Sequence, residues 1–259
     1  MNSEQLKSKL NSRFEYITQE KENKTMSDIS ETSLKSNQEY VALAGNTIDI
    51  IKQNLKNQPL SLQLFDTVKA PSGGATVFTV PGISGDEAEK SITGIILDYT
   101  TPRAYWETSD PVEGTPPACY SKDSIISFDG KACCSCPYNT YGSKDGESNA
   151  KACKESVSLF MLRPGNIMPI IVRIPVSSKV IFQRYLTRLI SKMIPISSVI
   201  TKITLSKTTN KSGQPYSIYN FEAASVLPPN EVSKANDFSK SFMEIMASND
   251  TCINNKAAG

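Results

Sequence analysis

Histidine is absent from this chain of 259 residues, and tryptophan occurs only once. Without an imidazole, the protein has no Ser–His or Cys–His nucleophile pair, no histidine general base and no histidine metal ligand. Any metal site must therefore use cysteine or carboxylate ligands.

Long apolar runs are also missing. No stretch approaches the roughly 18 residues of a membrane-spanning helix, and Met1–Leu10 is polar and has no signal-peptide core. We therefore expect a cytoplasmic protein without a membrane segment.

Apolar residues make up 39% of the chain, which is enough for a sizeable core but slightly low for a fully globular chain. The length corresponds to one large domain or to one domain with appendages.

Acidic residues are nearly missing from one part of the chain. Residues 151–221 hold eleven Lys and Arg but a single acid, Glu155, so this segment carries +10 in a chain whose total charge is +2. Such a concentration of positive charge is typical of proteins that bind a polyanion. The alternative is a solvated basic face that acidic flanks balance, since residues 222–259 carry −2.

The order of the expected elements favours a mainly β fold with some α content. We expect strands at 91–99, 156–163, 168–174, 197–207 and 216–223, and a helix at 177–193 between the third and fourth strands. This order is typical of an OB-fold-like five-stranded barrel, in which the loops after strands 1 and 4 bind oligonucleotides. The alternative is another small β-barrel or an α+β sandwich.

Three regions are expected along the chain. Residues 1–58 form a polar, partly disordered N-terminal arm with a short helix near 47–55, residues 59–228 form the OB-fold-like domain, and residues 229–259 form a C-terminal helix and tail. Residues 108–155 lack periodicity and hold five of the six cysteines. We expect them to form an irregular insert after the first strand.

The cysteine spacing predicts a metal site in this insert. A cytoplasmic chain keeps its cysteines as thiols, so metal ligation is favoured over disulfides. Cys133 and Cys136 form a C-x-x-C turn, and the predicted ligands of a structural zinc ion are Cys119, Cys133, Cys136 and Cys153. Cys134 is an alternative to Cys133. Free buried thiols and a secreted disulfide framework are the other interpretations.

Aromatic residues lie close to cations in several parts of the sequence. Single-stranded nucleic acid is bound by such a mixture, because cations neutralise the backbone while aromatic rings stack on the bases. Tyr216 and Tyr219 are three residues apart, so on a regular strand only one of them is expected to be accessible. The alternative is that these aromatics pack in the core or at its rim. The candidate nucleic-acid-binding residues are Arg103, Tyr105, Trp106, Tyr138, Tyr141, Arg163, Arg173, Lys202, Lys207, Lys211, Tyr216 and Tyr219.

Four short segments carry a resemblance to a known group of proteins. They are CCSCPYNTYGS at 133–143, KACK at 151–154, PSGG at 71–74 and RAYW at 103–106. With these segments, the chain resembles the zinc-containing single-stranded DNA-binding proteins of phages and mobile elements. It is also similar in plan to the helix-destabilising protein of T-even phages. That protein uses one histidine ligand, and here Cys119 must take its place.

The resemblance implies a zinc-bearing OB-fold and a role in DNA replication or recombination, in the bacterial host cytoplasm if a phage encodes the chain. We therefore expect a largely sequence-independent single-stranded DNA-binding protein without catalysis. Many proteins of this class end in an acidic tail that recruits replication partners, whereas residues 249–259 hold only Asp250. The alternative is a zinc-dependent adaptor that docks a replication or recombination protein. A metal-dependent nuclease is disfavoured because residues 156–221 hold no carboxylate side chain.

Overall fold

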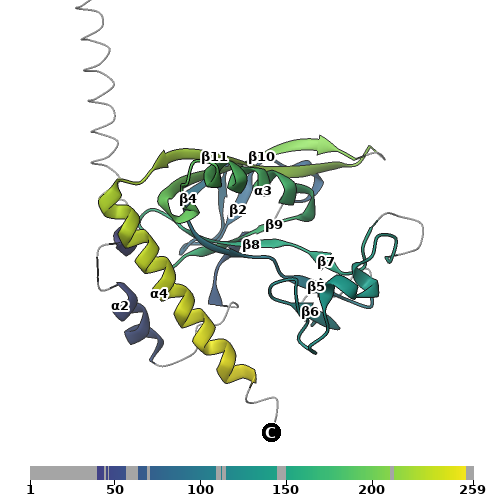
Figure 1. Ribbon diagram of the computed structural model, residues 1–259. Coiled ribbons are helices and arrows are strands. Elements are labelled where there is room, and N and C mark those ends of the chain that lie inside the picture. The colour runs from purple at the N-terminus through teal and green to yellow at the C-terminus, as the bar shows by residue number, and fades with distance from the viewer. Residues whose placement is uncertain are drawn as a thin grey trace, which may run out of the picture.

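Figure 1 shows a computed structural model of the protein. The structure describes residues 40–43, 45, 47–56, 64–68, 71–108, 112, 115–144, 150–210 and 213–254, with only the backbone for 247–254. Most of the expected N-terminal arm, the candidate Lys211 and the last five residues lie outside the described residues.

The main sheet has six strands, and its order is β1-β9-β8-β4-β10-β11. All neighbouring pairs are antiparallel except β1 and β9, which are parallel. The five strands expected from the sequence are confirmed to within a few residues. The bounds are Thr67–Val68 for β1, Ser91–Thr100 for β4, Val157–Leu162 for β8, Ile170–Ile174 for β9, Val199–Thr209 for β10 and Pro215–Val226 for β11.

Helices cover both faces of this sheet, and each face has its own hydrophobic core. On one face lie α3 (Val176–Ile190) and the hairpin of β2 (Phe78–Val80) and β3 (Glu87–Glu89). On the other face lie α4 (Pro229–Asn254), α2 (Thr47–Leu55) and the short helix η1 (Val41–Leu43). The diagonal course of α4 is visible in Figure 1. No helix within the described residues is long and apolar enough to cross a membrane.

The expected barrel is not formed, because the sheet is open. Among the described residues, β9 pairs with β1 instead of closing onto β11. The sheet stays open because it has a core on each face, whereas a barrel encloses a single interior. Strand β8 is buried at all six of its positions, so its side chains pack on both faces of the sheet. A strand that is covered on both faces has a nearly continuous run of apolar residues in its sequence. The sequence of β8, VSLFML, is close to such a run.

A second, smaller sheet follows β4 in the chain and lies apart from the main sheet (Figure 1). Its order is β6-β5-β7, with β5 at Arg103–Tyr105, β6 at Cys119–Ser121 and β7 at Lys154–Glu155. Two single-turn helices, η4 (Cys133–Ser135) and η5 (Pro137–Asn139), lie between β6 and β7. The expectation of a wholly irregular segment at 108–155 is therefore wrong. Two- and three-residue strands are too short to produce a periodic pattern in the sequence.

Gly94 lies where β4 passes closely over β8. A Cβ atom at this position would lie 2.9 Å from Met161 Cγ and still closer to the carbonyl oxygen of Leu162. Gly94→Ala is therefore expected to lower the free energy of unfolding by about 1–3 kcal/mol, as measured by urea denaturation. Thr93→Ala, at a half-buried neighbouring position, is the control with a smaller expected change. Equal unfolding midpoints for Gly94→Ala and the wild type would contradict this packing.

Candidate functional site: the cysteine lobe

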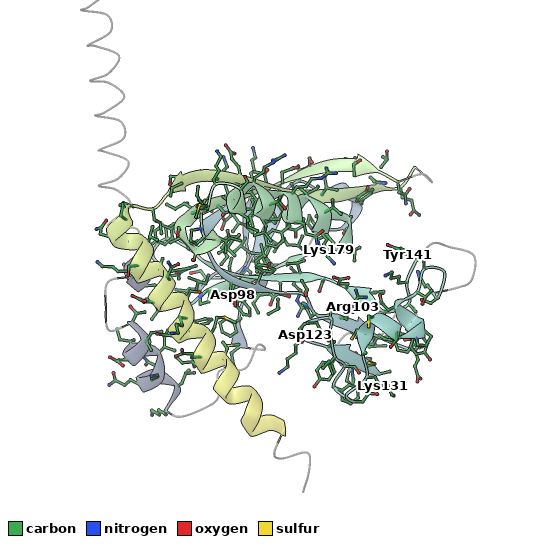
Figure 2. The ribbon with its side chains drawn as sticks, viewed as in Figure 1. Asp98, Arg103, Asp123, Lys131, Tyr141 and Lys179 are labelled. Carbon is green, nitrogen blue, oxygen red and sulfur yellow. The ribbon has the colours of Figure 1, made fainter. Side chains whose placement is uncertain are left out.

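The cysteine lobe consists of the described residues between Arg103 and Glu155, which form the small sheet and the two helical turns. Figure 2 shows Tyr141 at its outer end, Lys131 at its lower end and Arg103 where it meets the main body. Neither of the two hydrophobic cores includes a residue of this lobe. The lobe must therefore be stabilised by something other than a large apolar interior.

Four thiols line a single cavity of about 680 Å³ in the lobe. Cys133 and Cys153 are buried, while Cys119 and Cys136 are half-buried. Cys134 is exposed and does not line the cavity. Of the two alternatives that the sequence leaves open, Cys133 is therefore the one that faces the other three thiols.

Backbone hydrogen bonds hold the cysteine segments against each other. The η4 turn closes with a bond from Cys136 N to Cys133 O (3.4 Å), which places both residues of the C-x-x-C pair on one tight turn. Cys153 N donates to Tyr138 O (2.8 Å), and the Asn139 side chain donates to Cys133 O (2.7 Å). These contacts bring Cys153 next to a turn that lies about twenty residues earlier in the chain.

The thiols influence one another electrostatically. Burial raises the pKa of Cys119, and the negative charge of Asp129 raises it further, whereas the nearby Lys131 opposes the rise. Burial also raises the pKa of Cys153, although the neighbouring Arg103 opposes this rise. In the part of the chain that the structure describes, no three Cys, Asp or Glu side chains are arranged to hold a metal ion. The donors of a four-cysteine site therefore share a cavity without converging on one point.

Arg103 is buried at the base of the lobe, with 10% of its side chain exposed. Its guanidinium pairs with Glu155 at 2.5 Å and donates to Asn139 Oδ1 at 2.5 Å. Glu155 also pairs with Lys179 of α3, so this carboxylate connects the lobe to the main body. Figure 2 shows Lys179 above Arg103. Arg103 therefore faces a carboxylate that it shares with Lys179, and its contact with nucleic acid stays a prediction.

A small hollow on the lobe brings aromatic rings and cations together. Its lining includes Tyr105, Trp106, Lys144 and Lys154 together with one carboxylate, Glu107, and its volume is about 80 Å³. Trp106 is half-buried, and its indole Nε1 donates to Thr115 O at 3.0 Å. We call this site the Trp106 hollow. Its indole is held in place at the edge of the lobe beside two lysines.

Two further predicted tyrosines belong to the same lobe. Tyr138 stacks on Tyr105 with ring centroids 4.0 Å apart and an angle of 14° between the rings. Tyr141 is 73% exposed, and Lys151 Nζ lies 4.5 Å from its ring centroid. The four aromatics predicted from residues 105–141 thus belong to one lobe.

The remaining predicted residues lie on the main body instead. Arg163 pairs with Glu89 at 2.7 Å. Arg173 on β9 and Lys207 on β10 are exposed, and Lys202 is half-buried. Lys202 and Lys207 share β10, Arg173 lies on β9 and Arg163 follows β8. None of these cations lines the Trp106 hollow.

The two tyrosines on β11 differ in accessibility. Tyr216 is 37% exposed. Tyr219 is fully buried and packs edge-on against Phe78. Burial raises the pKa of Tyr219 far above its usual value. The prediction that Tyr219 stacks on a base is wrong, because its ring has no accessible face.

Comparisons of the chain with protein-family models, with curated proteins and with solved structures found no match.

Sequence reasoning missed an exposed aromatic pair on the lobe. Tyr120 and Phe128 stack with ring centroids 5.1 Å apart and an angle of only 4° between the rings. They are 41% and 59% exposed. The backbone bond from Phe128 N to Tyr120 O (2.9 Å) brings them together. Phe128 lies in the loop between β6 and η4, where no periodic pattern exists to indicate the pair.

Proposed function

We propose that the cysteine lobe binds single-stranded DNA, with the Trp106 hollow as its central contact. The observation that carries this proposal is the placement of Trp106 and Tyr105 in one hollow with Lys144 and Lys154. An aromatic ring offers a stacking surface to any base, and a lysine offers a charge to any phosphate. Such contacts carry no base code, so binding is largely independent of sequence.

The positive charge of α3 and of the segment that contains it supports the same proposal. Exposed cations on α3, Arg184 and Arg188, lie one helical turn apart, and no acidic residue occurs between Ser156 and Phe221. A field of one sign guides a polyanion toward the protein and raises the rate of association. The resemblance of the sequence adds a role in the replication or recombination of phage or mobile-element DNA, with the protein acting by binding and not by catalysis.

The proposal includes a structural zinc ion bound by Cys119, Cys133, Cys136 and Cys153. Two features support it: the four thiols share one cavity, and the lobe contributes nothing to either hydrophobic core. A small segment without an apolar interior needs a disulfide or a metal for stability. Zinc with four thiolates has no open coordination position, so it would hold the lobe together and take no part in a reaction. The cysteine residues would position the segments that carry Trp106 and Tyr138.

The proposal is tested by measuring the affinity for a labelled thymidine oligonucleotide at several salt concentrations. Each phosphate contact on a single strand contributes about −0.7 to the slope of log affinity against log salt. Replacing both Lys144 and Lys154 with alanine is therefore expected to make the slope less steep by about 1.4. The same change at Lys52 and Lys56, which are exposed on and just after α2, is the matched control and should leave the slope unchanged.

Two results would contradict the proposal. One is an affinity for a duplex of equal length that matches the affinity for the single strand. The other is an equal effect of the two pairs of lysine substitutions, which would mean that any surface lysine contributes and that the hollow is not the contact.

A further inference from the structure

The small sheet of the lobe has a second face, opposite to the one onto which Cys119 points. β5 is the central strand, and Ala104 lies opposite Tyr120 of β6 and opposite Lys154 of β7. Residues directly opposite each other in a sheet point to the same face, and neighbours along a strand point to opposite faces. Tyr120, Ala104 and Lys154 therefore form one row across the sheet, and Tyr105 and Cys119 point to the other face.

Exposure agrees with this assignment. Tyr120 and Lys154 are exposed, whereas Cys119 and Glu155 beside them are half-buried. Adjacent strands lie roughly 4.8 Å apart, so β6 and β7 are about 10 Å apart across β5. Between them Ala104 has only a methyl group. The row therefore presents the ring of Tyr120 on β6 and the ammonium group of Lys154 on β7. The short side chain of Ala104 leaves a shallow depression between them.

The aromatic side of this row is a rigid pair of rings. Tyr120 stacks almost parallel on Phe128. The segment that carries Phe128 is fixed by bonds from Ser127 N to Lys131 O (2.9 Å) and from Gly130 N to Ser127 O (2.9 Å). Asp123 accepts bonds from Ile125 N (2.8 Å) and Ile126 N (3.2 Å), which hold the chain between the two rings. Exposed rings that are held in place lose little conformational entropy when they bind a ligand.

Lys154 connects this row to the Trp106 hollow. Its side chain lines that hollow, and its residue lies opposite Ala104 at the centre of the row. A strand whose phosphate lies at Lys154 can therefore place one base at Trp106 and continue over Ala104 to the paired rings.

We infer that Tyr120 and Phe128 form a second base-stacking platform, and that one DNA strand crosses the outer face of the sheet from the Trp106 hollow to this pair. The inference rests on the proposed function and extends it, since it assigns a path and a second contact to the bound strand. A flat ring pair in one row with a lysine suits a base and its phosphate better than it suits an apolar helix, which needs a groove.

The test moves the only tryptophan to the platform. In a Trp106→Phe background, Phe128→Trp places a single fluorophore beside Tyr120. A thymidine oligonucleotide is expected to quench its fluorescence, as stacking on a base does. The wild-type protein, whose only tryptophan lies in the hollow, is titrated in parallel. Quenching at Trp106 without any change at position 128 would overturn the platform and leave the proposed function intact. Absence of binding by both proteins would overturn both.

Affinity measurements provide the second arm of the test. Tyr120→Ala is expected to weaken binding of the oligonucleotide by about 5- to 150-fold, the effect of losing one stacked base, whereas Tyr120→Phe keeps the ring and should bind as the wild type does. Circular dichroism and zinc content show whether Tyr120→Ala remains folded. A folded Tyr120→Ala variant with wild-type affinity would overturn the inference. It would instead assign the rings, together with the exposed Ile125 and Ile126, to a protein partner.

Discussion

Cys136→Ser is expected to abolish stoichiometric zinc binding and to unfold the cysteine lobe while the main sheet stays folded. The lobe adds no residue to either hydrophobic core, so zinc is its main source of stability in this account. Structural zinc sites in small domains contribute about 10–16 kcal/mol of apparent folding free energy, far more than the lobe's surface ion pairs. Zinc content per chain, together with the rate of proteolysis within 108–155, measures the effect.

The adjacent Cys134 provides a matched control. It is exposed and lies outside the cavity that the four predicted ligands share. Cys134→Ser is therefore expected to retain zinc and to resist proteolysis as the wild type does. If purified wild-type protein contains no zinc and gains no protease resistance when zinc is added, or if the two variants behave alike, the four-cysteine site is wrong.

Trp106→Ala is expected to weaken binding of a single-stranded oligonucleotide by about 5- to 150-fold, which corresponds to the 1–3 kcal/mol of one stacked base. The loss should persist at high salt, because stacking does not depend on counterion release as phosphate contacts do. Trp106→Phe keeps a ring but loses the bond to Thr115 O, so an intermediate affinity is expected. Fluorescence anisotropy of a labelled oligonucleotide at low and high salt measures all three proteins.

Ile83→Ala is the control for this substitution. Ile83 is fully exposed on the turn between β2 and β3, outside the lobe, so its removal should leave the affinity unchanged at both salt concentrations. A Trp106→Ala protein that binds as tightly as Ile83→Ala would show that the hollow takes no part in binding.

The sequence predicted five of the six strands of the main sheet but did not predict that the sheet stays open. Strand β4 and helix α3 were evident from the spacing of their apolar residues. The open form was not evident, because it depends on α4, which packs Phe238 and Phe242 on a face that a barrel would leave to solvent. Ser178 near the start of α3 is a similar case: its Oγ accepts a bond from Tyr219 N on β11, a contact that the sequence does not indicate. Both the open form of the sheet and the hydrogen bond of Ser178 depend on contacts between segments that are far apart in the sequence.

The candidate site was predictable where it depended on local spacing. The C-x-x-C pair and its two distant cysteines do line one cavity, and the aromatics near Trp106 do lie together. The ion pair of Arg103 was not predictable because its partner Glu155 lies 52 residues further along the chain, and only the pairing of β5 with β7 brings the two charges together. The Tyr120–Phe128 pair was missed for a similar reason, since a loop hydrogen bond creates it.

The most direct test of the central claim uses the fluorescence of Trp106, the only tryptophan in the chain. The zinc-loaded protein is titrated with a thymidine oligonucleotide and with a duplex of equal length, each at low and at high salt. If the lobe binds single strands at the Trp106 hollow, the oligonucleotide quenches the fluorescence strongly, the duplex quenches it weakly, and high salt shifts the midpoint to higher concentration. An unchanged fluorescence with both nucleic acids would contradict the account.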